Sequence, residues 1–249
     1  MEPREYERLA ASEERMWWFR GLHANLVAAW KKRAASAGAA ATLRLLDAGC
    51  GTGGFLRRLR VDAPGAICCG LELDGAAARV AGQKSVAAIV AGSVERLPFA
   101  DQAFDAIFSA DVLCHRGVAE EAALGEFRRC LRPRGVLVLN LPAYRWMFSA
   151  HDIAVDNARR YGTSELRLAL AAAGFVEAQI LHWNAILFPL MVLRRKILRR
   201  APGAPSDVGL LPAPVERFFF ACVAFEAALA ARGLALPFGG SILATAVRP

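Results

Sequence analysis

Short apolar segments alternate with amphipathic ones from about residue 43 to residue 182, and this alternation restricts the folds open to the chain. The apolar runs are short and continuous, which suits parallel strands that are covered on both faces. Helical patterns separate them, as where Leu124, Phe127 and Leu131 form one apolar stripe. Strands and helices in alternation predict a doubly wound α/β sheet. The predicted strands are Leu43–Leu46, Ile67–Leu71, Ala87–Val90, Ala106–Phe108 and Val136–Leu141, and the predicted helices are Gly54–Val61, Ala76–Gln83 and Glu120–Leu131.

Further elements are predicted on both sides of this core. A helix begins at Thr163 or Ser164 and ends at Gly174, and Phe175–His182 and Ser241–Val247 have strand patterns. Residues 5–34 and two apolar stretches, Ala185–Leu193 and Val215–Arg232, are expected to be helical. We therefore predict a single domain over residues 1–249, with an N-terminal helical lid (1–42), a core (43–183), a helical insertion between strands six and seven (184–236) and a closing strand (237–249).

Composition narrows the class of protein. An apolar fraction of 55% supports a sizeable core and excludes a disordered chain. The net charge is +8, and charged residues crowd the first eight positions, so we expect no secretory signal and a cytoplasmic location, peripheral to the inner face of the membrane. The six cysteines have no metal-ligand spacing, so we expect free thiols and no metal.

A glycine cluster, Gly49–Gly54, follows the first predicted strand and leads into a helix. Glycine lets the backbone turn tightly and approach a ligand without a Cβ atom in the way. The helix that begins near Gly53 offers unpaired N–H groups to a polar ligand. Glu72 follows about 20 residues later, at the end of the second strand, where a carboxylate accepts hydrogen bonds from ribose hydroxyls. The spacing predicts a nucleoside site.

The same glycines also satisfy the dinucleotide pattern G-x-G-x-x-G, so NAD is an alternative ligand. Asp47 argues against it, because a carboxylate two residues before the first glycine repels a pyrophosphate but can hold the ammonium of an amino acid. No second mononucleotide half follows the fifth strand, and the stretch Gly92–Asp111 has a different signature.

Four segments resemble the motifs of the class I S-adenosylmethionine-dependent methyltransferases. Leu46–Gly53 matches the first motif at every usual position, and Gly70–Asp74 is similar to the second. Val94–Ala106 resembles the third and fourth, and Leu131–Gly135 resembles the turn before strand five. The resemblance covers roughly residues 43–182. It implies a Rossmann-like seven-stranded sheet and S-adenosylmethionine (SAM) as cofactor, with S-adenosylhomocysteine as product.

The resemblance also implies roles for single residues. Asp47, Gly49 and Gly51 line the methionine end of the cofactor, Glu72 binds the ribose, and Ser93 with Val94 contacts the adenine. Ser93 stands where many relatives carry an aspartate, so a hydroxyl replaces a carboxylate there. The full set of cofactor-binding residues that we predict is Asp47, Gly49, Cys50, Gly51, Gly53, Glu72, Leu73, Ser93, Val94 and Ala110.

Two segments beyond the strand ends are candidates for contact with the methyl acceptor, residues 109–115 and residues 141–161. In the second, His151 next to Asp152 predicts a base with its own orienting carboxylate, and His115 and Tyr144 are the alternates. Arg159 and Arg160 either brace the loop through carboxylates such as Asp152 or bind a phosphate on the acceptor. The predicted substrate-binding residues are Trp18, Arg20, Trp146, Asp152, Arg159, Arg160 and Tyr161.

The second segment is also similar to a bacterial methyltransferase subfamily often associated with envelope and natural-product pathways. The likeness lies in PAY at 142–144, HD at 151–152 and RRY at 159–161. Members commonly carry a histidine where this chain has Asn157, so a role of that histidine is not kept here. The run Asn140–Tyr144 faintly resembles the motif of amino-methylating DNA methyltransferases, but it follows the wrong strand, and we expect no nucleic-acid partner.

The insertion adds an apolar run followed by five basic residues within Arg194–Arg200. This order suits a helix at an anionic membrane surface, and the alternatives are a packed hairpin or a homodimer contact. No apolar run reaches roughly 18 residues, so we expect no spanning helix. We predict methyl transfer from SAM to a hydrophobic or lipid-linked small molecule at the membrane. A soluble phenol, quinone precursor, sugar or natural product is the alternative acceptor, and a non-catalytic cofactor-binding scaffold is the alternative of another class.

Overall fold

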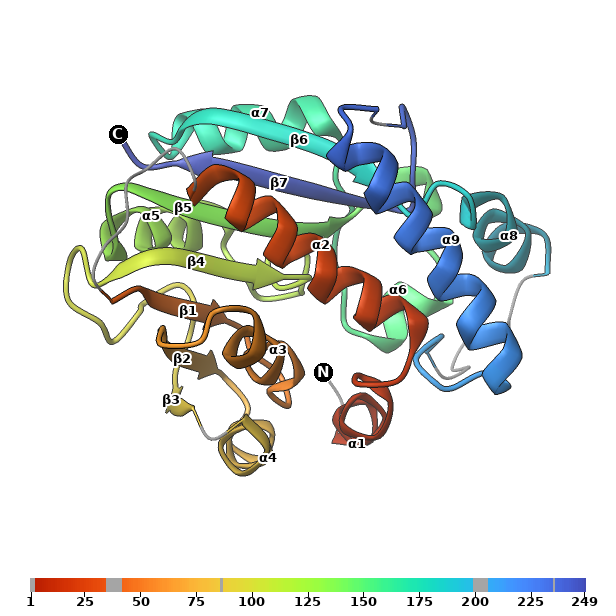
Figure 1. The fold of residues 1–249 in the computed structure, drawn as a ribbon, viewed down its shortest axis with the longest axis horizontal. Coiled ribbons are helices and arrows are strands. Elements are labelled where there is room, and N and C mark those ends of the chain that lie inside the picture. The colour runs from red at the N-terminus through yellow and green to blue at the C-terminus, as the bar shows by residue number, and fades with distance from the viewer. Residues whose placement is uncertain (1–2, 35–41, 86, 199–205, 235) are drawn as a thin grey trace.

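A computed structural model describes residues 3–34, 42–85, 87–198, 206–234 and 236–249. Its strands form one seven-stranded sheet in the order β3-β2-β1-β4-β5-β7-β6 (Figure 1). All neighbours pair in parallel except β7, which runs antiparallel to both β5 and β6. This confirms the predicted doubly wound sheet. The strands are β1 (Arg44–Ala48), β2 (Ile67–Glu72), β3 (Ala88–Ala91), β4 (Phe104–Ala110), β5 (Leu131–Pro142), β6 (Val176–Trp183) and β7 (Ser241–Val247).

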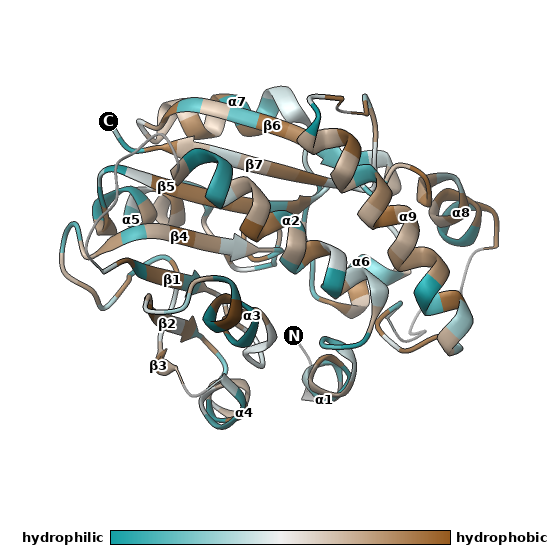
Figure 2. Cartoon of the chain, viewed as in Figure 1, coloured by the Kyte–Doolittle hydropathy of each residue, from teal (hydrophilic) through white to brown (hydrophobic). Residues whose placement is uncertain are grey.

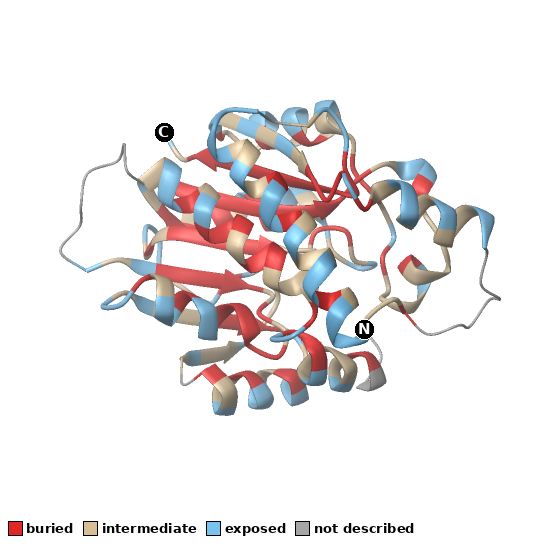
Figure 3. Cartoon of the chain, turned by 45° about the vertical axis from the view of Figure 1, so that its right-hand side comes forward, coloured by how far each residue is buried: buried red, intermediate tan, exposed pale blue. Residues whose placement is uncertain are grey.

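Helices cover both faces of the sheet, which explains why its central strands are mainly apolar. Alternate side chains of β5 point to opposite faces: Leu137 and Leu139 pack with helices α5 and α7, whereas Val138 packs with α2 and α3. Figure 2 shows apolar colouring along the central strands, and Figure 3 shows them buried beneath partly exposed helices. The helices of this core are α2 (Trp17–Ala34), α3 (Gly54–Asp62), α4 (Gly75–Ser85), α5 (Glu120–Cys130) and α7 (Thr163–Ala172).

The N-terminal segment forms two helices, α1 (Pro3–Ser12) and α2, where we expected one over residues 5–34. The break lies at residues 13–16 and has two causes. Glu13 turns toward the glycine loop, where its carboxylate accepts a hydrogen bond from Thr52 Oγ1 at 2.7 Å. The first backbone N–H of α2 donates to Glu216 Oε2 at 2.6 Å, so that a carboxylate caps the start of this helix.

The insertion packs against α2 through α9 (Ala213–Ala231), whose two buried glutamates hold neighbouring segments. Glu216 also accepts from the backbone N–H of Leu211 at 2.8 Å. Glu226 accepts from the backbone N–H groups of Ala185 and Ile186 at 2.9 and 2.7 Å, and this fixes the chain outside a helix there. The predicted helix 185–193 therefore starts later, as α8 (Phe188–Val192), and continues as a π-helical turn, Leu193–Ile197.

A loop with short helical turns connects β5 to α7. It holds a 3-10 turn, Arg145–Met147, and a short helix, α6 (Ala150–Ala154). Among the described helices, none has the length and apolar character needed to cross a bilayer.

Candidate active site

A cavity of about 700 Å³ lies at the carboxyl ends of the parallel strands. Its wall on the sheet side is formed by the glycine loop and by residues at the ends of β1, β2, β4 and β5. Helix α1, the first turns of α2 and the insertion close it from the other side. This is the edge where doubly wound sheets bind ligands. Segments far apart in the sequence therefore enclose one space.

The glycine loop is shaped by backbone conformations that suit glycine alone. Gly49 has φ of +87° and Gly53 has φ of +86°, both in the left-handed region. A Cβ atom on Gly49 would lie 2.2 Å from Val112 Cγ2. The backbone N–H groups of Gly49 and Cys50 donate to the carbonyl of Leu71 at 2.8 and 2.9 Å, which ties the loop to β2. A side chain at Gly49 would therefore collide with Val112, which also lines the cavity.

Replacing Gly49 by alanine is expected to lower the free energy of unfolding by about 2–4 kcal/mol, since it adds backbone strain to a clash with Val112. Urea denaturation measures this change. The matched control is Gly125→Ala in α5, where a Cβ atom meets nothing within 4 Å, and a small gain in stability is expected. Equal effects at both glycines would contradict the tight geometry of the loop.

Buried carboxylates concentrate negative charge beside the loop. Asp47, Glu72 and Glu13 are each less than a tenth exposed. Burial, reinforced by the charges of Glu72 and Glu13, raises the pKa of Asp47 to about 8. All three line the cavity, and of them Glu13 is paired with Lys84. A positively charged ligand group is therefore favoured beside Asp47, and the ammonium of SAM fits this requirement.

Glu72 is held by three donors at the end of β2. Its carboxylate accepts from the backbone N–H of Gly51 at 2.8 Å and from that of Asp74 at 3.0 Å. The third donor is Tyr6 Oη of α1, at 3.1 Å. Helix α1 therefore lies directly over the predicted ribose site. Sequence reasoning missed Tyr6, because it lies outside every motif and reaches Glu72 only through the tertiary fold.

The structure gathers almost the whole predicted cofactor set around the cavity. Gly53 is the exception: it is absent from the lining and instead sits at the N-terminus of α3, where a Cβ would meet Ala81. Ser93 Oγ accepts from the backbone N–H of Glu95 at 3.2 Å, within a local turn. The predicted residues that line the cavity are Asp47, Gly49, Cys50, Gly51, Glu72, Leu73, Ser93, Val94 and Ala110.

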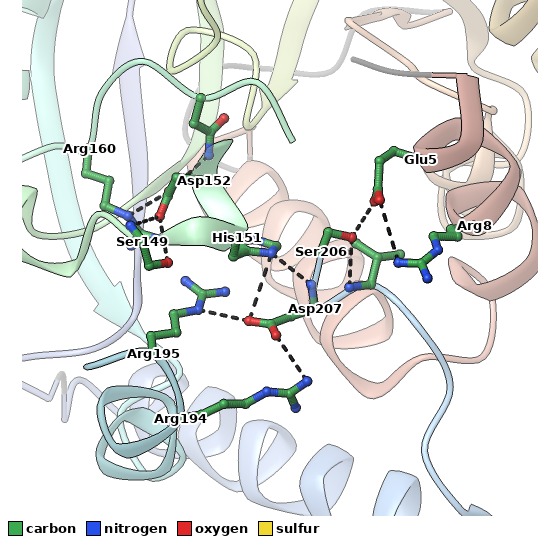
Figure 4. A network of polar contacts seen from close by, with 12 residues as sticks. Glu5, Arg8, Ser149, His151, Asp152, Arg160, Arg194, Arg195, Ser206 and Asp207 are labelled. Atoms are coloured by element: carbon green, nitrogen blue, oxygen red, sulfur yellow. Dashed lines mark hydrogen bonds and ion pairs between the residues drawn. The ribbon is translucent and has the colours of Figure 1, made fainter. Parts of the chain in front are cut away.

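The predicted pairing of His151 with Asp152 does not form. Asp152 accepts from the backbone N–H of Ser149 at 2.9 Å, which caps α6, and from Arg160 Nε at 2.8 Å. His151 points away from it, toward Asp207 of the insertion (Figure 4). The reason is helical geometry, since adjacent residues on a helix project in different directions. Asp152 and Arg160 thus brace the loop, which was one of the two alternatives for this arginine.

The surroundings of His151 favour another role than that of the predicted base. Its Nδ1 accepts a hydrogen bond from the backbone N–H of Asp207 at 3.0 Å. Burial, aided by the charge of Arg195, lowers the pKa of His151 to about 3, so the ring is neutral. A neutral imidazole that accepts at Nδ1 carries its proton on Nε2. His151 is therefore a hydrogen-bond donor in this arrangement.

Three other predicted residues reach the cavity, and one of them is Arg160, which also braces the loop. His115 lines it beside Asn157, and burial lowers the pKa of His115. Trp18 lines it as well and stacks on Trp183 with ring centroids 5.8 Å apart. The N-terminal segment thus acts both as a cover, through α1 and Trp18, and as core packing, through Trp30.

The remaining predicted acceptor residues lie outside the cavity lining because other contacts engage them. Tyr161 is buried and donates to the carbonyl of Leu113 at 2.9 Å, and Arg159 donates to that of Val118 at 2.7 Å. Tyr144, which was predicted as an alternative base, stacks on His182. Trp146 is half exposed against Phe188, and the Arg20 guanidinium lies 3.7 Å from the centre of the Phe220 ring.

Asp111 is a candidate functional residue that sequence reasoning did not single out. It directly follows β4, lines the cavity and has φ of +54°, a strained value for a residue other than glycine. Asn140 Nδ2 donates to both carboxylate oxygens at 3.1 Å, and Trp183 Nε1 fixes that amide by donating to its Oδ1 at 2.8 Å. Burial raises the pKa of Asp111 to about 7, which suits a proton acceptor near neutral pH.

One cysteine, Cys50, is among the described residues that line the cavity. The cysteines are free thiols, and burial raises the pKa of the Cys50 thiol that lines the cavity, so it stays protonated. Within the part of the chain that the structure describes, no group of histidine, cysteine and acidic side chains could hold a metal ion.

Comparison with known proteins agrees with this geometry. Residues 46–139 match the family described as "Methyltransferase domain". The chain is 32% identical over 111 residues to 24-methylenesterol C-methyltransferase 2 of Oryza sativa subsp. japonica, covering 42% of this chain and 29% of that protein. It is 40% identical over 100 residues to malonyl-[acyl-carrier protein] O-methyltransferase of Dechloromonas aromatica, covering 40% and 36% respectively. The chain thus spans about a third of the length of these curated relatives.

Solved structures share the fold. A SAM-dependent methyltransferase from Thermotoga maritima superposes with a TM-score of 0.62 at 20% identity, over 99% of this chain and 95% of that one. Phosphoethanolamine N-methyltransferase 2 of Haemonchus contortus, in complex with SAM, gives 0.56 at 15% identity, over 88% and 53%. Residues 46–139 thus match a methyltransferase domain, and the sheet order and the glycine loop are those of the class I S-adenosylmethionine-dependent methyltransferase fold.

Proposed function

We propose that this protein transfers the methyl group of SAM to a hydrophobic small molecule enclosed in the cavity. The observation that carries the proposal is that the cavity joins two unlike surfaces. Asp47, Glu72 and the glycine loop line one part of it, and apolar side chains of α2 and of the insertion line another. The apolar residues are Trp17, Phe19, Leu22, Leu187, Leu190, Met191 and Phe219.

The chain's own residues would bind, orient and shield the reactants. Asp47 in its charged form holds the ammonium of the cofactor, and Glu72 accepts from the ribose hydroxyls. The bound cofactor supplies an electrophilic methyl group on a sulfonium. Helix α1, which contacts Glu72 through Tyr6, covers this end of the cavity and excludes water. Catalysis then depends mainly on alignment of the acceptor with the methyl group.

Asp111 is the residue we propose for proton removal from an acceptor hydroxyl or amine. It lines the cavity, Asn140 fixes its orientation, and its pKa of about 7 leaves much of it charged at neutral pH. His151 cannot take this role while its Nδ1 accepts from Asp207.

Replacing Glu72 by glutamine is expected to weaken SAM binding at least tenfold, because a charge-assisted acceptor for the ribose is lost. Isothermal titration calorimetry measures the dissociation constant. Glu121→Gln on the exposed face of α5 is the matched control and should leave it unchanged. Unchanged affinity in Glu72→Gln would overturn the assignment of Glu72 to the ribose.

The acceptor class rests on the apolar lining and on the names of the relatives. These describe methyl transfer to a 24-methylenesterol and to a malonyl group on an acyl-carrier protein. Both names support a small, lipid-related acceptor for this chain. An apolar wall of tryptophan, leucine and phenylalanine side chains also suits a hydrophobic molecule better than a sugar.

The membrane prediction loses part of its basis in the structure. Arg194 and Arg195 turn inward to Asp207, and Lys196 Nζ donates to the carbonyl of Phe148 at 2.7 Å. Arg199 and Arg200, which completed the predicted basic run, lie outside the described residues. Association with a membrane surface and formation of a homodimer stay predictions. Phe218 and Phe225 on α9 expose apolar side chains that either kind of contact would cover.

The proposal is tested by incubating the protein with methyl-labelled SAM and a cell extract that has been split into lipid and aqueous pools. The label transferred to each pool is then measured. We expect label in the lipid pool with the wild type and little with Glu72→Gln. Label in the aqueous pool alone would instead support a soluble phenol, quinone precursor or sugar. Tight binding of S-adenosylhomocysteine without label in either pool would support a non-catalytic scaffold.

A further inference from the structure

We infer that the acceptor carries a carboxylate, which binds Arg194 and Arg195 at the insertion side of the cavity and anchors the molecule for methylation elsewhere. The inference rests on the proposed function and names the acceptor more closely as an amphipathic acid. Neither arginine was expected to contact the acceptor, because their place in a basic run suggested an outward-facing surface.

The two arginines converge on one carboxylate at the cavity wall (Figure 4). Arg194 Nη2 lies 3.1 Å from Asp207 Oδ1, and Arg195 Nε lies 3.0 Å from Asp207 Oδ2. Both arginines belong to the π-helical turn Leu193–Ile197, a distortion that occurs often at functional sites. A carboxylate group already occupies the position between the two guanidinium groups, which shows that the geometry accepts one.

The arginines drawn in Figure 4 outnumber the carboxylates that pair with them among the described residues. Arg8 is paired with Glu5, and Arg160 is paired with Asp152. Among the described residues, Arg194 and Arg195 both pair with the one carboxylate of Asp207, so two cations share one described counter-charge. Burial, together with the charge of Arg160, lowers the pKa of Arg195, which is consistent with incomplete compensation. A monoanion at this place would supply a second counter-charge for the two arginines.

A third donor and an apolar wall complete the site. The neutral ring of His151 lines the cavity and carries its proton on Nε2, so it offers a hydrogen bond to an anion. Leu187, Leu190 and Met191, which directly precede the arginines, provide an apolar surface for the body of the ligand. An acid with a hydrocarbon body matches both surfaces.

The site is also connected to the cofactor end of the cavity. Ser206, next to Asp207, donates a hydrogen bond to Glu5 of α1, and Tyr6 of the same helix contacts Glu72. A ligand that binds Arg194 and Arg195 competes with Asp207 for these two arginines. It therefore acts on the segment Ser206–Asp207, which holds α1 through Glu5. The anion site and the cover of the cofactor site thus share one wall.

Binding of decanoate and of decanol tests the inference, since the two probes share a hydrocarbon chain and differ in charge. Fluorescence of Trp17 and Trp18, which line the cavity, or calorimetry reports binding to the full chain. We expect decanoate to bind the wild type at least tenfold more tightly than decanol. Arg194→Gln and Arg195→Gln should remove this preference and leave decanol affinity unchanged, whereas Asp207→Asn should strengthen decanoate binding.

Controls separate the anion site from the rest of the account. Arg217→Gln on the exposed part of α9 removes an arginine without touching the cavity and should keep the preference. Arg194, being the more exposed of the pair, provides a variant that folds even where Arg195→Gln does not. Equal affinity for decanoate and decanol, or tighter binding of decyl phosphate than of decanoate, would overturn the inference. Binding of S-adenosylhomocysteine, measured separately, shows whether the proposed function itself has failed.

Discussion

Asp111→Asn is expected to lower kcat about 100-fold, while the affinity for SAM stays close to that of the wild type. The substitution keeps the shape of the side chain but removes its ability to accept a proton, and general base catalysis contributes at least about this factor. Initial rates of label transfer to the responsive acceptor pool measure kcat, and calorimetry measures cofactor binding. A loss of cofactor affinity equal to the loss of rate would contradict a role in proton removal.

The pH profile gives a second reading of the same residue. Because burial raises the pKa of Asp111 to about 7, its carboxylate becomes protonated as the pH falls below that value, and kcat/KM should fall with it. The amide of Asn140 stabilises the charged form, so Asn140→Ala should move this acid limb to higher pH. His151→Gln should leave the limb in place. A limb that disappears with His151 instead would return the role of base to that histidine.

Asp47→Asn is expected to weaken SAM binding about 100-fold, the effect of removing one partner of a buried ion pair. The wild type should also release close to one proton when the cofactor binds at pH 7. The pKa of Asp47 is about 8 in the free protein, so the group is mostly protonated there, and it must ionise to hold an ammonium.

Calorimetric titrations in phosphate and in Tris measure this proton release, because the two buffers differ strongly in their heat of ionisation. The apparent binding enthalpies should differ for the wild type by nearly the full difference between the buffers. Whatever binding remains in Asp47→Asn should show the same enthalpy in both. Identical enthalpies for the wild type would show that Asp47 is already charged before the cofactor binds.

The fold was predictable because its signals are local and repeated. The central strands β5 and β7 are buried on both faces, so Val136–Leu141 and Ser241–Val247 read as mainly apolar runs in the sequence. The glycine loop was predictable for a related reason: Gly49 and Gly53 adopt positive φ values that only their residue type permits without strain. Patterns of this kind depend on the backbone and need no knowledge of distant contacts.

The acceptor side was predicted less well because distant contacts decide it. Tyr6 reaches Glu72 and Asp207 reaches His151 across long stretches of sequence, and no motif records either contact. His151 and Asp152 suggested a pair by adjacency, but a helix turns them apart. The basic run after α8 indicated a surface, yet its first two arginines pair with a partly buried aspartate at the cavity wall. Composition alone does not tell an inward charge from an outward one.

Equilibrium binding of SAM and of NAD to the same wild-type preparation tests most directly the central claim that the glycine loop, Asp47 and Glu72 form a SAM site. We predict that one SAM binds per chain with a dissociation constant of about 1–100 µM, that S-adenosylhomocysteine displaces it, and that NAD does not bind. A folded protein that binds NAD at this loop, or that binds no SAM, would contradict the account.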